Sequence, residues 1–323
     1  MRTLFVCLIA SGLGLAQVPS VGLVELYGVR KVPEERLRNA IGVRAGDPLP
    51  GSKIEIEQRV RNVPGVLLAH VEAECCSGAG AVLYVGIEER DAPHVEFHSP
   101  PAGSASLPEV LTDVYNDFVG YFGETARSGI PTGPSAEAYG ATLGRLATAN
   151  LDSLRKVLRE SEDAEQRAMA ASILRFAPLT QGLVDDLQYA MLDDDATVRA
   201  SAMRTLRAMA AAAARDPDLG VRVELTWYVE LLNSLVWEDR TGAATALVGL
   251  TESRDPGTLD YLRDRALGAL VEMARWKTPA HAHAAFVLVG RIAGLPEKEI
   301  EETWKRGDRE AVISRLPKSK PFR

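Results

Sequence analysis

The sequence predicts two structural parts, a small α+β module followed by an all-α solenoid. Over residues 24–89 apolar residues alternate, then recur at helical spacing, then alternate again, which predicts the order β-α-α-β-β. Residues 91–108 are rich in proline and serine, which is typical of a linker. From residue 109 the spacing is helical, and the motif at 163–174 recurs at 195–206, which predicts stacked helix pairs.

Each element of the first part has its own signal. Val24 and Leu26 alternate with Glu25 and Tyr27, which predicts a half-buried strand. A helix begins after Pro33, because proline is tolerated in a first helical turn. A second helix and two strands follow. Their predicted apolar faces are Ile56, Val60 and Val63 for the helix, and Leu67, Ala69, Val71, Ala73, Leu83, Val85 and Ile87 for the strands.

Four motifs in this part carry a resemblance to a known family. They are a strand ending at Gly28, Glu34-Glu35-x-Leu37, Gly46-Asp47-Pro48-Leu49 and Pro64-Gly65-Val66. Their order and spacing resemble the polypeptide-transport-associated (POTRA) domain, and residues 17–90 are assigned to such a domain. The resemblance implies a module that precedes outer-membrane assembly or secretion barrels, or belongs to a division protein.

The resemblance also implies a binding edge. In POTRA domains the second strand commonly lies at the sheet edge and pairs with an extended partner segment. The alternative, which we favour, is a solvated edge whose charges discourage pairing. The matching strand here is Leu68–Cys75, and the candidate partner-binding residues are Leu68, His70, Val71, Glu72 and Glu74.

The helical part, residues 109–316, resembles HEAT repeats. The shared pattern is Asp-x-x-x-Arg-Ala, at Asp163 to Arg167 and at Asp195 to Arg199. Each aspartate is predicted to cap the following helix, and the resemblance implies that each arginine pairs with an acid of the next repeat. Weaker echoes at 239–250 and 278–290 lack the arginine, and residues 317–323 form a basic tail.

The first residues predict export. Arg2 precedes an apolar run of 12 residues, 4–15, and small residues precede Gln17, so residues 1–16 read as a cleavable signal peptide. The alternative is a disordered or buried N-terminal strand. No further segment is long and apolar enough to cross a membrane, so we expect a periplasmic chain, peripheral to a membrane at most.

Cys75 and Cys76 remain after removal of Cys7 with the signal peptide. They are adjacent, so they give no disulfide framework. The favoured interpretation is two small residues at a strand end. The alternative is a vicinal disulfide, which closes a strained ring and is therefore labile.

No arrangement of residues in the sequence indicates catalysis. The net charge of −7 argues against nucleic acid as a partner. His281 and His283 are two residues apart, which is a poor spacing for a metal on a helix, and the pair His94 and His98 falls in the proline-rich joint. We expect neither metal nor cofactor, because no phosphate-binding or nucleophile motif occurs.

These observations favour a non-catalytic scaffold of the bacterial cell envelope, with protein partners such as an extended polypeptide or a membrane assembly component. The alternative is a ligand-binding or enzymatic HEAT-like protein, with a groove near Trp227 and Trp237. A third alternative is that the first module only stabilises the second. It would show as a large apolar contact between the two.

Overall fold

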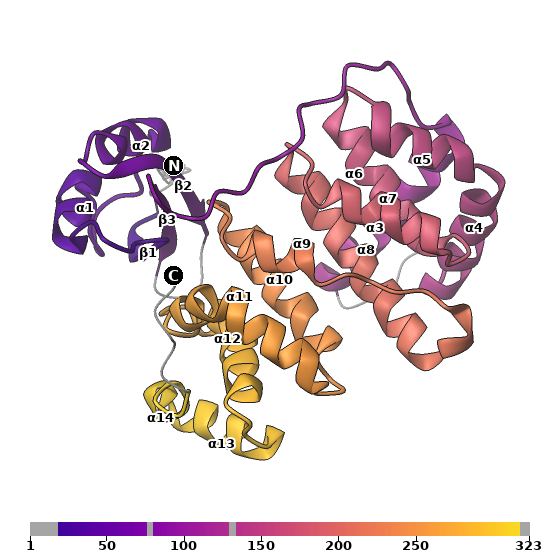
Figure 1. The fold of residues 1–323 in the computed structure, drawn as a ribbon. Coiled ribbons are helices and arrows are strands. Elements are labelled where there is room, and N and C mark those ends of the chain that lie inside the picture. The colour runs from indigo at the N-terminus through magenta and orange to yellow at the C-terminus, as the bar shows by residue number, and fades with distance from the viewer. Residues whose placement is uncertain (1–18, 76–79, 129–133, 317–323) are drawn as a thin grey trace, which may run out of the picture.

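The computed structural model describes residues 19–75, 80–128 and 134–316. The predicted signal peptide and basic tail lie outside these residues. A small sheet with two helices stands beside a curved array of helix pairs (Figure 1). The elements of the first part are β1 (Val21–Tyr27), α1 (Glu34–Ile41), α2 (Lys53–Arg61), β2 (Val66–Glu74) and β3 (Ala81–Glu89). Their order is the predicted β-α-α-β-β.

The sheet has the strand order β1-β3-β2. β1 runs parallel to β3, and β2 runs antiparallel to it. Every residue of β3 is buried, because strands flank it and both faces are covered. The helices α1 and α2 cover one face through Leu37, Ile56 and Val60, which pack on Leu83 and Val85 as the sequence predicts.

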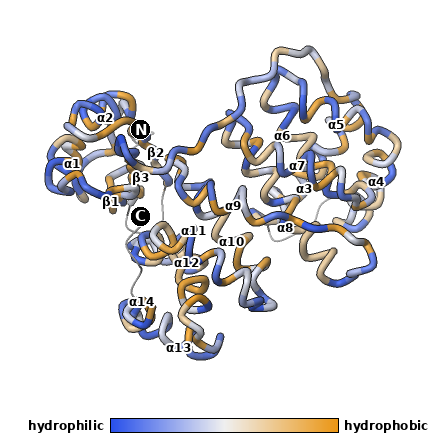
Figure 2. Tube along the Cα trace, viewed as in Figure 1, coloured by the Kyte–Doolittle hydropathy of each residue, from blue (hydrophilic) through white to orange (hydrophobic). Residues whose placement is uncertain are grey.

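The prediction of a helical repeat region is confirmed. Its helices form successive pairs, and the second helices α6, α8, α10 and α12 pack in series. Along most helices hydrophilic and hydrophobic positions alternate (Figure 2), which is the pattern of helices that bury one side. The helices are α3 (Glu109–Ser128), α4 (Ala136–Ala149), α5 (Leu151–Glu160), α6 (Ala164–Ile173), α7 (Gln181–Ala190), α8 (Ala196–Arg215), α9 (Thr226–Leu231), α10 (Trp237–Leu250), α11 (Pro256–Ala274), α12 (Pro279–Ile292), α13 (Glu297–Arg306) and α14 (Arg309–Ile313), with short 3-10 turns at Leu174–Phe176 and Pro217–Leu219.

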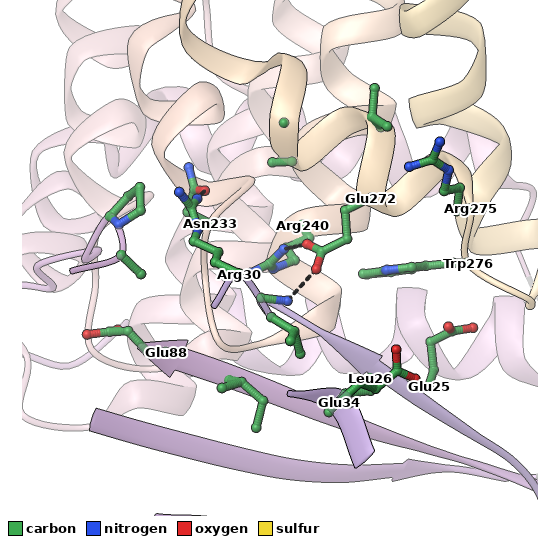
Figure 3. A pocket seen from close by; sticks show the side chains of 18 of the residues that line it. Glu25, Leu26, Arg30, Glu34, Glu88, Asn233, Arg240, Glu272, Arg275 and Trp276 are labelled. Atoms are coloured by element: carbon green, nitrogen blue, oxygen red, sulfur yellow. Dashed lines mark hydrogen bonds and ion pairs between the residues drawn. The ribbon is translucent and has the colours of Figure 1, made fainter. Parts of the chain in front are cut away.

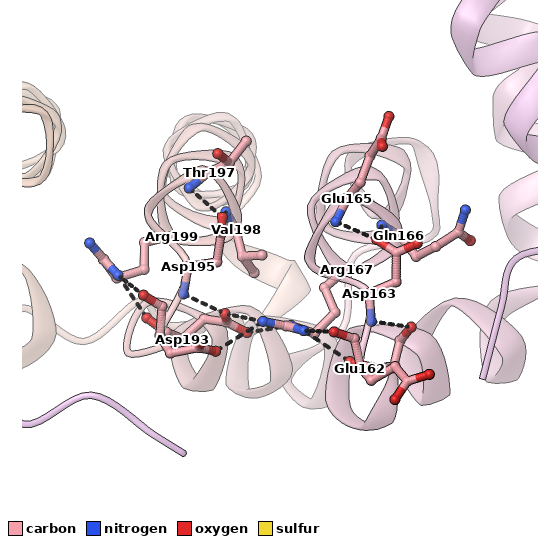
Figure 4. Close-up of polar contacts among 12 residues, drawn as sticks. Glu162, Asp163, Glu165, Gln166, Arg167, Asp193, Asp195, Thr197, Val198 and Arg199 are labelled. Atoms are coloured by element: carbon pink, nitrogen blue, oxygen red, sulfur yellow. Dashed lines mark hydrogen bonds and ion pairs between the residues drawn. The ribbon is translucent and has the colours of Figure 1, made fainter. Parts of the chain in front are cut away.

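Two buried arginines repeat the same contacts in successive repeats (Figure 4). Arg167 forms a bidentate pair with Asp193, at 2.7 and 2.8 Å, and donates to carbonyl oxygens of the loop before α6. Arg199 pairs in the same way with Asp239 and donates to the carbonyl oxygens of Asp193 and Asp194, both at 2.9 Å. Each arginine therefore ties its own loop to the next repeat.

The pattern continues where the sequence analysis missed it. Arg240 donates to the Ser234 carbonyl oxygen at 2.6 Å and pairs with Glu272 at 2.9 Å. It lies four residues after the N-cap Val236, as Arg167 and Arg199 do after their aspartates. In the sequence analysis the motif starts at Asp239, which is an acid. The true cap position is Val236, three residues earlier, and it lacks the expected aspartate. We call Arg167, Arg199 and Arg240 the arginine row.

The aspartate caps are confirmed. The Asp195 carboxylate accepts the backbone N–H groups of Thr197, at 2.8 Å, and Val198, at 3.2 Å, and Asp163 does the same one repeat earlier. We expect Asp195→Ala to lower the free energy of unfolding by about 1 kcal/mol, because two N–H groups lose their acceptor. Urea denaturation measures this, with Asp195→Asn, which keeps a capping oxygen, as the control. An equal loss in both variants would contradict the cap.

The proline-rich segment, residues 91–108, runs from the sheet to the far end of the helical array (Figure 1). It is extended, and it lies against the repeats. The His98 N–H donates to the Leu192 carbonyl oxygen at 2.7 Å. Gly103 exchanges two backbone hydrogen bonds with residues 160 and 162, and the Phe97 ring lies 4.0 Å from the Arg199 guanidinium. The repeats therefore hold an extended stretch of this chain along the edge that carries the arginine row.

The sheet and the repeats share one hydrophobic core. Tyr27, Val82 and Tyr84 of the sheet belong to the same buried cluster as the apolar residues of α5 to α12. The Tyr27 hydroxyl donates to the Leu235 carbonyl oxygen at 2.6 Å, and the Gly28 N–H donates to Glu272 at 2.6 Å. This is the apolar contact that the third alternative requires, so the first module does stabilise the second.

Candidate functional site

The strand predicted to bind a partner, β2, lies at a sheet edge. Among the described residues it pairs with β3 alone. Its central donor is already occupied, because the Val71 N–H donates to the Glu57 carboxylate of α2 at 2.8 Å. Leu68 is half-buried in the same strand. A partner strand would have to displace Glu57 before it could pair here.

The charged face of β2 lies against the repeats. His70 Nδ1 is 3.3 Å from Glu57, and His70 Nε2 is 3.3 Å from Glu72, whose hydrogen bond raises the pKa of His70. Glu74 lies 3.7 Å from His281 of α12. Burial, reinforced by the charge of Glu72, raises the pKa of Glu238 at the start of α10. His70, Glu72 and Glu74 are half-buried between the sheet and the repeats, and the alternation in the sequence could not show this.

The two tryptophans of the predicted groove have packing roles. Trp237 is 8% exposed and stacks on Tyr84, with ring centroids 4.6 Å apart. It also lies 4.5 Å from the His281 ring. Trp227 is half-buried against the shared core. Trp237 therefore joins the repeats to the sheet by ring contacts on Tyr84 and His281.

The predicted cysteine pair falls at the edge of the described residues. Cys75 is disulfide-bonded, and Cys76 lies outside the residues that the structure describes. Within residues 19–75, 80–128 and 134–316, no group of His, Cys, Asp and Glu is arranged to hold a metal ion. In the same part of the chain no helix is both long enough and apolar enough to cross a membrane.

A cavity lies at the other edge of the sheet, along β1 (Figure 3). Its volume is about 860 Å³. Glu25 and Leu26, which point to opposite faces of β1, both line it. One wall comes from α1, through Glu34 and Arg38, and the other from α11, through Glu272. Because its walls come from both sides of the sheet, the cavity follows the free edge of β1. We call it the β1 groove.

The backbone of β1 has its free edge in this groove. Val21 lies just before the register shift of β1 at residues 21–23. Its N–H points away from the sheet and donates to the backbone carbonyl oxygen of Asp47 at 2.8 Å. After the shift the N–H of Gly28 also points away, to Glu272. Backbone groups alternate in direction along a parallel strand, so the amides of Leu26 and Val24 share the direction of Gly28. The loop before α2 and Glu272 cover the two ends of this edge.

Most charges that line the groove are paired. Lys31 bonds Asp91 at 2.9 Å, and Arg240 bonds Glu272. Glu25 accepts the Lys277 N–H at 2.6 Å, although burial raises the pKa of its carboxyl. The other pairs are Arg38 with Glu34, Arg275 with Glu310, and Glu88 with His94. Within the described residues the side chains of two lining cations, Arg30 and Lys277, form no ion pair, and Arg30 has only a long contact of 3.4 Å to Asn233.

The α11 wall is made of small residues near its centre. Gly268 and Ala269 line the groove, and a Cβ atom at Gly268 would meet nothing within 4 Å. The wall turns charged at Glu272 and Arg275, one and two helical turns further on. Sequence reasoning missed this site because its walls lie more than 200 residues apart in the chain.

Comparison with known proteins gives the fold little context. No family model and no curated protein matches the chain. Eight solved chains match its structure. One is the designed armadillo repeat protein YIII(Dq)4CqI, which is 14% identical, with 66% of this chain and 93% of that chain covered and a TM-score of 0.35. The repeats are therefore identified from the packing of this chain's own helices.

Proposed function

We propose that this chain is an exported, non-catalytic scaffold of the bacterial cell envelope that binds extended polypeptide segments. The observation that carries the proposal is the contact made by the proline-rich segment. The repeats hold that segment by backbone hydrogen bonds at Leu192 and Gly103 and by ring contacts at Phe97 and His98. Backbone bonds with side-chain contacts in between are the usual way in which an extended peptide is recognised.

The envelope location is supported by sequence features only. Residues 1–16 have the composition of a signal peptide, and residues 24–89 resemble POTRA domains in the order of their motifs. In such domains a small sheet binds extended chains of exported or assembling proteins. A link to outer-membrane assembly, secretion or division machinery follows from this resemblance.

A second candidate function is supported by the β1 groove. Its volume is that of a small-molecule site, and it contains Glu25, a carboxyl whose pKa burial raises. A ligand-binding or enzymatic protein would use such a group. We rank this function second, because the Glu25 carboxylate already accepts a backbone N–H in a structural contact.

The test uses the full chain in the source bacterium, because the sheet and the repeats share a core and isolated fragments would expose it. Fractionation and mass measurement should find the chain in the periplasm without residues 1–16. In-cell crosslinking should then join it to a defined envelope protein. A chain that keeps its N-terminus in the cytoplasm would contradict the location, and crosslinks to no protein would favour the second candidate.

A further inference from the structure

We propose that the β1 groove is where a partner binds, and that the partner contributes an extended acidic segment that pairs with the free edge of β1. This inference rests on the proposed scaffold function and adds the place and the chemistry of the contact. It also moves the binding edge from β2, which the sequence analysis singled out, to the opposite side of the sheet.

The two edges differ in what covers them. At β2 the central edge amide, of Val71, is bonded to Glu57, and α2 packs along the strand. At β1 residue 47 bonds one end of the edge and Glu272 bonds Gly28 within the cavity, which follows the chain from Glu25 past Gly28 to Lys31. Among the described residues the amides of Val24 and Leu26 donate to no loop or side-chain acceptor, so an extended segment can bond them, with Leu26 in the groove itself.

The dimensions of the groove fit a short strand. From Val24 to Gly28 the edge is about 13 Å long, at about 3.3 Å per residue. A segment of roughly five residues therefore covers it. Alternate side chains of that segment would point to the α1 wall and to the α11 wall. The small residues Gly268 and Ala269 leave room on the α11 side, where Arg30 and Lys277 also lie, for the acidic side chains of the segment.

The charges select an acidic segment. The unpaired cations of the groove, Arg30 and Lys277, come from two different places. Arg30 follows β1 and reaches toward Asn233 (Figure 3). Lys277 lies beside Glu25, which accepts its backbone N–H. Each can pair with one carboxylate of a bound strand, whereas a basic segment would leave both cations without a partner. The occupant is therefore a strand that alternates small apolar residues with acidic ones.

The probe is a labelled peptide of seven residues that alternates valine and glutamate, and binding is measured by fluorescence anisotropy at low salt. Two comparison peptides carry lysine in place of glutamate, or N-methylated valines that cannot donate from the backbone. Gly268→Leu adds a side chain to the α11 wall at a position where the Cβ atom meets nothing within 4 Å. Gly249→Leu is its matched control, since Gly249 is also an open helical position and lines no part of the groove.

We expect the full chain to bind the acidic peptide, and Gly268→Leu to weaken binding by roughly tenfold or more, while Gly249→Leu binds as the wild type does. Lys277→Glu should weaken the acidic peptide and favour the lysine peptide. Hydrogen exchange at the Leu26 amide should slow when the acidic peptide binds. The N-methylated peptide should bind weakly.

Four results would overturn the inference. They are no binding of any peptide, equal binding by the two leucine variants, equal binding of acidic and basic peptides, and complete competition by inorganic phosphate without protection of Leu26. The last result would identify a small-anion site. If Gly268→Leu still crosslinks to the wild-type envelope partner in cells, the scaffold function stands and only the β1 groove is excluded.

Discussion

Replacing Arg199 with methionine should lower the free energy of unfolding by about 3–5 kcal/mol at pH 7. The side chains of Arg199 and Asp239 are 2% and 1% exposed, and three contacts of 3.0 Å or less join them. The variant leaves the Asp239 carboxylate buried, and among the described residues the Ser234 hydroxyl is then its one side-chain donor. It also leaves two loop carbonyl oxygens without their guanidinium donor.

Guanidinium chloride denaturation at several pH values tests this result. Without Arg199, burial holds the pKa of the Asp239 carboxyl above its ordinary value, so the folded variant takes up a proton more readily than the unfolded chain. Stability relative to wild type should therefore recover as the pH falls from 7 toward 5. A loss that does not change with pH would show that packing, and not the uncompensated charge, causes it.

Two controls separate the charge from the packing. The double variant Arg199→Met/Asp239→Leu should regain much of the lost stability, because no charge remains buried. Arg222→Met should change stability by less than about 0.5 kcal/mol, since Arg222 is 82% exposed and pairs with an exposed glutamate. A double variant as unstable as the single one would contradict the role given to the pair.

Local patterns in the sequence were enough to predict the elements and part of the polar core. Alternation and helical spacing report which face of an element is apolar, so the order β-α-α-β-β and the core residues Leu37, Ile56 and Val60 follow directly. A capping aspartate and an arginine four residues later form one local motif. This motif predicts that Arg167 and Arg199 pair with acids of the next repeat, as they do. Arg240 was missed because Val236 occupies its cap position, so the motif lacks its aspartate.

The docking of the sheet on the repeats could not be predicted in this way. It depends on residues far apart in the chain, such as Tyr27 with Leu235 and Tyr84 with Trp237. The polar side chains of β2 look solvated in an alternating pattern, yet they face α10 and α12. The proline-rich segment likewise looks like a free linker, because its hydrogen bonds use backbone groups that every sequence has. The β1 groove forms only when the sheet and the start of the proline-rich segment are packed against the repeats.

Gly86 is the residue at which this docking can be tested. It lies in β3 opposite Tyr27, and any Cβ atom there would overlap the Leu235 carbonyl oxygen and lie 2.9 Å from the Tyr27 ring. Gly86→Val should therefore push the sheet away from the repeats and break the Tyr27–Leu235 hydrogen bond. We expect a loss of about 3 kcal/mol, the upper part of the range for overpacked interiors.

The shape of the transition distinguishes undocking from a general loss of stability. If the sheet separates first, denaturation of Gly86→Val should show two steps, and hydrogen exchange should rise at Tyr84 and Trp237 before it rises in α6 and α8. Gly249→Ala, at an open helical position, should raise stability by about 0.5–1 kcal/mol. One cooperative transition with an unchanged midpoint in Gly86→Val would mean that the sheet is not held by this contact. The β1 groove, whose walls come from both parts, would then lose its structural basis.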